Sequence, residues 1–162
     1  MSAREPTGTY GYAAVGVQDK LYIWAGYRNV KTSTLETFNV SALKWEQPRQ
    51  LNGSIPDGLW NAAVTSDGEC AYTHGGLLSD STRLNSLHEI NTRTLQCRKL
   101  LPNSSSHAPQ KTHGCCMVYF RKKLVVYGGI AKQTCTNDLH VFDLDTSEYG
   151  SINLYSRIGS GA

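Results

Sequence analysis

The chain has 162 residues, of which 40% are hydrophobic and 18% are charged, and its formal net charge is +3. This is the composition of an ordinary globular domain that can bury a core, and not that of a disordered chain. The small net charge argues against a nucleic-acid partner, and the lack of an apolar run of about 18 residues argues against a membrane helix or a membrane partner.

Turn residues divide the sequence into three similar units. In the first unit, apolar and alternating runs predict strands over 12–17, 21–25, 35–40 and 44–48. The second unit predicts strands over 60–65, 70–74, 87–91 and 95–100. The third unit predicts strands over 113–120, 124–127, 139–144 and 148–154. Each unit therefore consists of two successive hairpins, which together make a four-stranded antiparallel sheet.

The three units keep one period. Phe38, Ile90 and Phe142 are 52 residues apart, and each is followed by Asn or Asp. The same period of 52 residues relates Trp45, Cys97 and Tyr149. A constant spacing near 50 residues is typical of architectures in which each unit buries one face against the next.

Glycines end the second strand of every unit, at Gly26, Gly75-Gly76 and Gly128-Gly129. Such a pair allows positive φ and a close approach of the backbone. Ala25 stands where the first glycine of the pair would be, which indicates that only the second position strictly needs glycine in that unit. Trp45 and Tyr149 are suited to filling the wedge between neighbouring units, and Cys97 is too small for it, so the second unit should pack least well there.

The glycine pair, the apolar residue with Asn or Asp closing the third strand, and the aromatic residue opening the fourth strand together resemble the kelch repeat. This resemblance covers almost the whole chain and implies an all-β fold of kelch-type β-propeller blades. We expect a single partial propeller over 1–162, with three four-stranded antiparallel blades at about 8–52, 57–102 and 110–156. Leu21 to Tyr27 also resembles the opening blade of kelch-domain substrate receptors of cullin ligases.

Closed propellers use about four to eight blades, so three blades leave two blade faces without a neighbour. Three alternatives stay open: the chain is part of a longer protein, two copies close a ring as a homo-oligomer, or a partner chain supplies the missing blades.

Catalytic and metal-binding patterns are missing from the sequence. His113, Cys115 and Cys116 are the tightest group, but only His113 and Cys115 share a strand face, and a metal needs three or four ligands. We therefore expect no metal, no cofactor and no catalytic residue. The basic turn at 121–123 is interpreted as a solvated hairpin tip.

Surface recognition is the remaining function. The loops after the second strands and the loops between blades leave the same face of a blade, so segments 27–34, 50–59, 77–86, 102–112 and 130–138 should cluster. The partner-binding residues that we predict on this loop face are Tyr27, Arg28, Trp60, Arg83, Lys111, His113 and Lys132. Aromatic and basic anchors suit an acidic peptide or a terminal carboxylate, although each charge on its own could simply be solvated.

The favoured function is a protein–protein interaction module with no catalysis. The alternative is a substrate-recognition fragment of a cullin-type ubiquitin ligase receptor. The N-terminus lacks the apolar stretch of a signal peptide, and five cysteines make an odd number. The sequence therefore predicts free thiols and a cytoplasmic or nuclear protein.

Overall fold

The structure is a computed structural model that describes residues 8, 10–27, 33–55, 59–78, 81–104 and 107–151. Within these ranges all regular structure is β, and no helix occurs that is long and apolar enough to cross a membrane. Residues 152–154, at the end of the fourth strand predicted in the third unit, lie outside the described ranges.

The first sheet has the order β1-β2-β3-β4. Its strands are β1 (Ala13–Val17), β2 (Lys20–Trp24), β3 (Thr34–Asn39) and β4 (Lys44–Trp45), followed by the short β5 (Arg49–Gln50). Both β4 and β5 pair antiparallel with β3, at its end and at its start. Of the strand expected over 44–48 only Lys44 and Trp45 are β, and β5 begins just beyond its expected end.

The second sheet has the order β6-β10-β9-β8-β7. Its strands are β6 (Asn52–Gly53), β7 (Ala63–Ser66), β8 (Cys70–His74), β9 (Leu87–Asn91) and β10 (Gln96–Leu100). Four of them form the predicted antiparallel unit. The fifth, β6, pairs parallel with β10 and was not predicted, because residues 50–59 were assigned to a loop.

The third sheet has the order β11-β12-β15-β16. Its strands are β11 (Cys116–Phe120), β12 (Lys123–Tyr127), β15 (Leu139–Asp143) and β16 (Glu148–Ser151). A separate two-stranded ribbon, β13 (Ile130–Ala131) and β14 (Thr134–Cys135), stands on the loop between β12 and β15.

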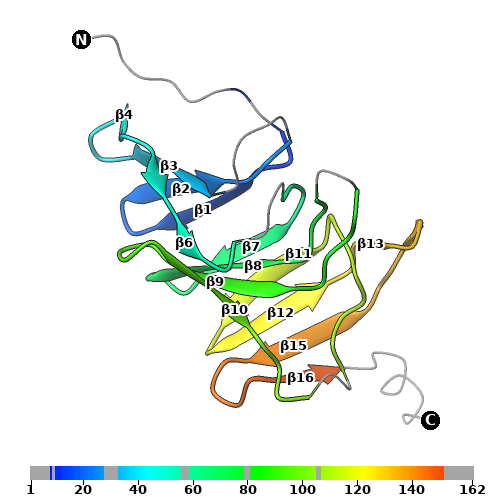
Figure 1. The fold of residues 1–162 in the computed structure, drawn as a ribbon. Helices are drawn as coiled ribbons and strands as arrows, with labels where there is room; N and C mark the ends of the chain where they lie inside the picture. The colour runs from blue at the N-terminus through cyan, green and yellow to red at the C-terminus, as the bar shows by residue number, and fades with distance from the viewer. Residues whose placement is uncertain are drawn as a thin grey trace, which may run out of the picture.

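The three sheets follow one another through the molecule, from β1–β4 in blue and cyan to β11–β16 in yellow and orange (Figure 1). Tyr22 and Trp24 of the first sheet are buried in one cluster with Ala71 and Ile90 of the second. A second cluster joins the second and third sheets. The core therefore lies between blades, and the expected all-β fold of kelch-type blades is confirmed. The exact blade boundaries stay a prediction.

Both positions of the glycine pair are in the left-handed region in every blade. The second position has φ of 105° at Gly26, 96° at Gly76 and 103° at Gly129. At the first position φ is 62° at Ala25 and 67° at Gly75. The first position therefore keeps a left-handed backbone whether it holds glycine or not, and Ala25 adopts with some strain the conformation that glycine adopts freely in the other two blades.

The wedge positions behave unequally. Tyr149 is 8% exposed and packs edge-on against Phe142 at 4.9 Å between ring centroids, whereas Trp45 is only half-buried against Phe38 at 5.2 Å. Cys97 is 2% exposed, contrary to the expected poor packing. The reason is the unpredicted strand β6. Ser54, the residue after β6, accepts a hydrogen bond from the Cys97 thiol through its backbone oxygen at 3.3 Å and covers the cysteine.

Candidate functional site

A repeated backbone feature positions the loop face. Gly11, Asn61 and Gly114 precede the inner strands of the three blades, and their φ values are 65°, 58° and 66°. The Asn61 N–H donates to Gly11 O at 2.6 Å, and the Gly114 N–H donates to Asn61 O at 3.0 Å. These bonds join equivalent points of successive blades.

This positive φ corrects the predicted start of the inner strands. We expected strands to begin at residues 60 and 113, but β7 begins at Ala63 and β11 at Cys116. Trp60 and His113 instead form isolated bridges with Leu77 and Ile130. The turn after them therefore separates both residues from the inner strands β7 and β11. The sequence signal for this turn is an aromatic ring followed directly by Gly or Asn, as in Trp60-Asn61 and His113-Gly114. The predicted strand starts did not take it into account.

Three rings meet at the first blade interface. Tyr27 lies 4.9 Å from Tyr10 and 5.4 Å from Trp60, measured between ring centroids, and Tyr10 lies 6.3 Å from Trp60. The indole N–H of Trp60 donates to Leu78 O at 3.2 Å, which fixes the ring. Tyr10 and Tyr27 remain 53% and 44% exposed, so the cluster offers aromatic surface to a partner.

Two of these three rings were predicted site residues, Tyr27 and Trp60. Tyr10 was not, although it stands just before Gly11 as Trp60 stands just before Asn61. The structure therefore adds Tyr10 to the candidate site and places it with the other two in one aromatic cluster.

Three predicted basic residues line one cavity. Arg83, Lys111 and Lys132 come from the loop after β8, the segment before β11 and the turn between β13 and β14, and they surround a cavity of about 580 Å³. The remaining lining residues carry hydroxyl or amide groups, among them Asn85, whose side chain donates to Pro109 O at 3.1 Å. None of the described residues that line this basic cavity is acidic.

Two buried nitrogen atoms near the basic cavity lack a hydrogen-bond partner among the described residues. They are Nε of Arg83 and Nδ1 of His113. Burial, and then the charge of Arg83, lower the pKa of His113 below its usual value, so this imidazole is neutral near pH 7. A guanidinium with an unused buried donor favours a partner group that brings negative charge and acceptor oxygens.

The other sequence-predicted charges are accounted for as follows. Arg28 lies outside the described residues, so its place on the loop face with Arg83 and Lys132 stays a prediction. At the opposite hairpin tip, Lys122 pairs with Asp145 at 2.9 Å and Lys123 pairs with Asp143. Each of these lysines has a carboxylate partner in its own blade, whereas the lining of the basic cavity includes no carboxylate in the part of the chain that the structure describes. Within the described ranges, no three His, Cys, Asp or Glu side chains gather where they could hold a metal ion.

Comparison with known proteins agrees with the fold. The sequence profile of the KLHDC2/KLHL20/DRC7 Kelch-repeats domain matches residues 1–161, and the chain belongs to this kelch-repeat family. It is 31% identical over 158 residues to the leucine-zipper-like transcriptional regulator 1 homolog of Drosophila melanogaster, which is 93% of this chain and 16% of that protein.

Other relatives match with a similar span. The human leucine-zipper-like transcriptional regulator 1 is 28% identical over 153 residues, covering 90% of this chain and 18% of that protein. The host cell factor of Drosophila melanogaster is 23% identical over 152 residues, covering 86% of this chain and 10% of that protein. The chain thus spans less than a fifth of each of these relatives.

Proposed function

We propose that the chain is a protein-interaction module whose loop face binds an acidic segment of a partner protein, without catalysis. The observation that carries this proposal is the basic cavity, in which Arg83, Lys111 and Lys132 come together and in which no lining residue within the described ranges is acidic. Beside it, the exposed rings of Tyr10 and Tyr27 supply the kind of aromatic surface that dominates binding energy at interfaces.

The rings and the cavity have separate roles in this proposal. The basic cavity would hold carboxylates of the partner through charge-assisted hydrogen bonds. The aromatic cluster would bury the apolar side chains that flank them. A substrate-recognition fragment of a ubiquitin ligase receptor would use the same face in the same way, with a degradation signal as its partner. A cytoplasmic or nuclear setting also stays a prediction.

A peptide selection tests this function. Peptides selected on the chain from a random display library should be enriched in Asp and Glu. In fluorescence anisotropy, the double variant Arg83→Glu/Lys132→Glu should bind the best peptide at least about tenfold more weakly, because each lost charged contact costs about 1.5–3 kcal/mol.

The matched control is Lys44→Glu/Lys99→Glu, which changes the net charge equally at two exposed lysines of the strands β4 and β10. It should leave the affinity unchanged. Equal loss in both double variants would mean non-specific attraction, and selection of peptides without acidic residues would refute the proposal.

The blade faces at the two ends suggest a second kind of partner, namely another blade. Trp24, His74 and Tyr127 each precede the glycine-pair position, and they are 3%, 0% and 46% exposed. In the first two blades the next blade covers this position. The backbone shows the same relation, because Gly26 N–H donates to Leu59 O and Gly76 N–H donates to Thr112 O, both at 2.8 Å across a blade interface.

We propose that a further kelch-type blade covers the face of the third sheet. Val118 and Phe120 of that face are 55% and 60% exposed, a large apolar surface for a protein that stays alone in water. A second copy of the chain would cover this face with its first blade, and additional sequence of a longer protein would cover it with a further blade.

A further inference from the structure

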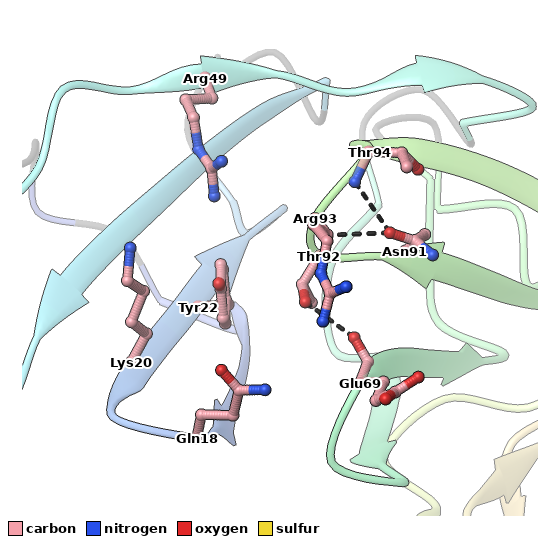
Figure 2. Close-up of a pocket in the computed structure, with 9 residues that line it drawn as sticks. All are labelled: Gln18, Lys20, Tyr22, Arg49, Glu69, Asn91, Thr92, Arg93 and Thr94. Atoms are coloured by element: carbon pink, nitrogen blue, oxygen red, sulfur yellow. Dashed lines mark hydrogen bonds between the residues drawn. The ribbon is translucent and has the colours of Figure 1, made fainter.

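A second cavity, of about 390 Å³, opens between the first and second blades. Lys20, Tyr22 and Arg49 line it from the first blade, and Glu69 and Arg93 line it from the second (Figure 2). It includes residues of the β1–β2 and β9–β10 turns, at the other end of the strands from the loop face. We call it the interblade cleft, and neither the predicted site nor the proposed function uses it.

Two guanidinium groups give the interblade cleft its charge. Nε of Arg49 is buried and has no hydrogen-bond partner among the described residues. The charge of Lys20 is balanced by a carboxylate, because its ammonium lies 2.7 Å from Glu46 Oε1. This hydrogen bond raises the pKa of Lys20, so the side chain stays protonated. The carboxylate of Glu69 points away from the first blade in Figure 2. Glu46 also interacts electrostatically with Arg49, so Lys20, Arg49 and Glu46 together leave one positive charge on the first blade. Arg93 supplies a second positive charge from the other side of the cleft.

The turn that carries Arg93 is held in place. The Asn91 side-chain oxygen accepts hydrogen bonds from Arg93 N at 3.0 Å and Thr94 N at 2.8 Å. The Thr92 hydroxyl donates to Glu69 O at 2.7 Å and ties this turn to the neighbouring hairpin (Figure 2). The backbone from which Arg93 extends is thus fixed without a ligand, so binding needs to order only its side chain.

The other described blade interface provides an internal comparison. There, Tyr72 stands where Tyr22 stands in the first blade, and its ring stacks on Tyr119 of the third blade at 6.2 Å with an interplanar angle of 5°. In β7 the position equivalent to Tyr119 is Ser66. Tyr119 pairs with the second residue of β12, and Ser66 pairs with the second residue of β8. A serine has no ring to stack on Tyr22, which explains the open gap at the interface between the first and second blades.

The charges differ between the two interfaces as well. The position of Lys20, which opens β2, is taken by Cys70 in β8. The position of Arg93, two residues after the residue that closes the third strand, is taken by Asp145. Asp145 is already paired with Lys122 at 2.9 Å. The basic character is therefore not a general property of the repeat and is specific to the interblade cleft.

We infer that the interblade cleft binds a phosphate group through Arg49 and Arg93. Two guanidinium groups match the two charges of a phosphate monoester near neutral pH, and their planar arrays of donors fit its oxygens. A single carboxylate would neutralise only one of them. The volume of about 390 Å³ falls in the range of ligand pockets and leaves room for the group that carries the phosphate.

Titration with inorganic phosphate tests this inference in the 162-residue chain. Amide resonances of Arg93 and Thr94 are followed by NMR while NaCl keeps the ionic strength constant, which separates binding from screening. We expect saturable shifts in the parent chain. Arg49→Gln and Arg93→Gln should each raise the dissociation constant about tenfold or more.

The control is Lys122→Gln, which removes one exposed charge from the equivalent hairpin end of the third blade and should leave the phosphate affinity unchanged. Arg93 is exposed on its turn, so Arg93→Gln should keep the fold even if Arg49→Gln does not. No saturable shift up to about 20 mM phosphate, where millimolar binding would be complete, would overturn the inference. Unchanged affinity in Arg93→Gln, or an equal loss in Lys122→Gln, would also overturn it.

Two further ligands distinguish the source of the phosphate group. A sugar phosphate represents a small phosphate ester, and a phosphothreonine peptide represents a modified partner protein. Tighter binding of either one than of inorganic phosphate, with loss in Arg93→Gln, would support the inference and identify the source. If the unphosphorylated peptide binds as well as the phosphorylated one, recognition of phosphate is refuted.

Discussion

The second glycine of the pair should be far more sensitive to substitution than its φ alone implies. Gly76 has φ of 96°, and a Cβ there would lie 2.6 Å from Leu59 Cδ1, 3.0 Å from Ala62 Cβ and 3.0 Å from Trp60 O. Leu59 is 2% exposed, and Trp60 O accepts a hydrogen bond from Leu77 at 2.8 Å, so neither can move freely. Gly76→Ala therefore combines backbone strain with overpacking.

Gly68 is a matched control within the same blade. Its φ is 98°, but a Cβ would meet nothing within 4 Å. Gly68→Ala should cost only the backbone strain, about 1–3 kcal/mol. Gly76→Ala should cost the same backbone strain and, in addition, about 1–3 kcal/mol for the contacts that its Cβ forces on Leu59, Ala62 and Trp60.

Thermal and urea unfolding of both variants measure the difference. For a chain of this size, about 1 kcal/mol corresponds to roughly 2–4 °C in Tm, so Gly76→Ala should melt at least about 2 °C below Gly68→Ala. Equal melting temperatures would show that the close approach of Leu59, Trp60 and Ala62 to Gly76 has no energetic weight, and the account of the glycine pair would fail.

Two other predictions concern stability and association. Burial lowers the pKa of His74 to about 4, so the unfolded chain binds more protons between about pH 6.5 and 4 and stability is lost as the pH falls through this range. His74→Leu should remove about 2 kcal/mol of this loss at pH 5, and parallel melting profiles of parent and variant would contradict it. Phe120→Lys should reduce self-association of the chain in analytical ultracentrifugation, because Phe120 is 60% exposed on the uncovered blade face. A parent chain that is already a monomer with a sharp thermal transition would refute that expectation.

Much of the fold could be predicted from the sequence because its signals are local and repeated. The glycine pairs, the apolar residue with Asn or Asp at the end of the third strand, and the alternating runs located the four strands that each unit has in common. The strand ends were less certain, since the positive φ at Asn61 and the parallel pairing of β6 depend on contacts with other blades. Local propensity carries no information on such contacts.

The candidate site could likewise be predicted only in part from the sequence. The sequence by itself determined that basic and aromatic residues stand in the loops at one end of the blades, because their place in the repeat is fixed. Only the tertiary structure decided that Arg83, Lys111 and Lys132 share one cavity and that Tyr10 joins Tyr27 and Trp60. It also decided that a serine in β7 leaves a basic gap between two blades. The physical reason is that a repeat pattern fixes the direction of each side chain within its own sheet, whereas distances between sheets depend on the volume of every side chain packed between them.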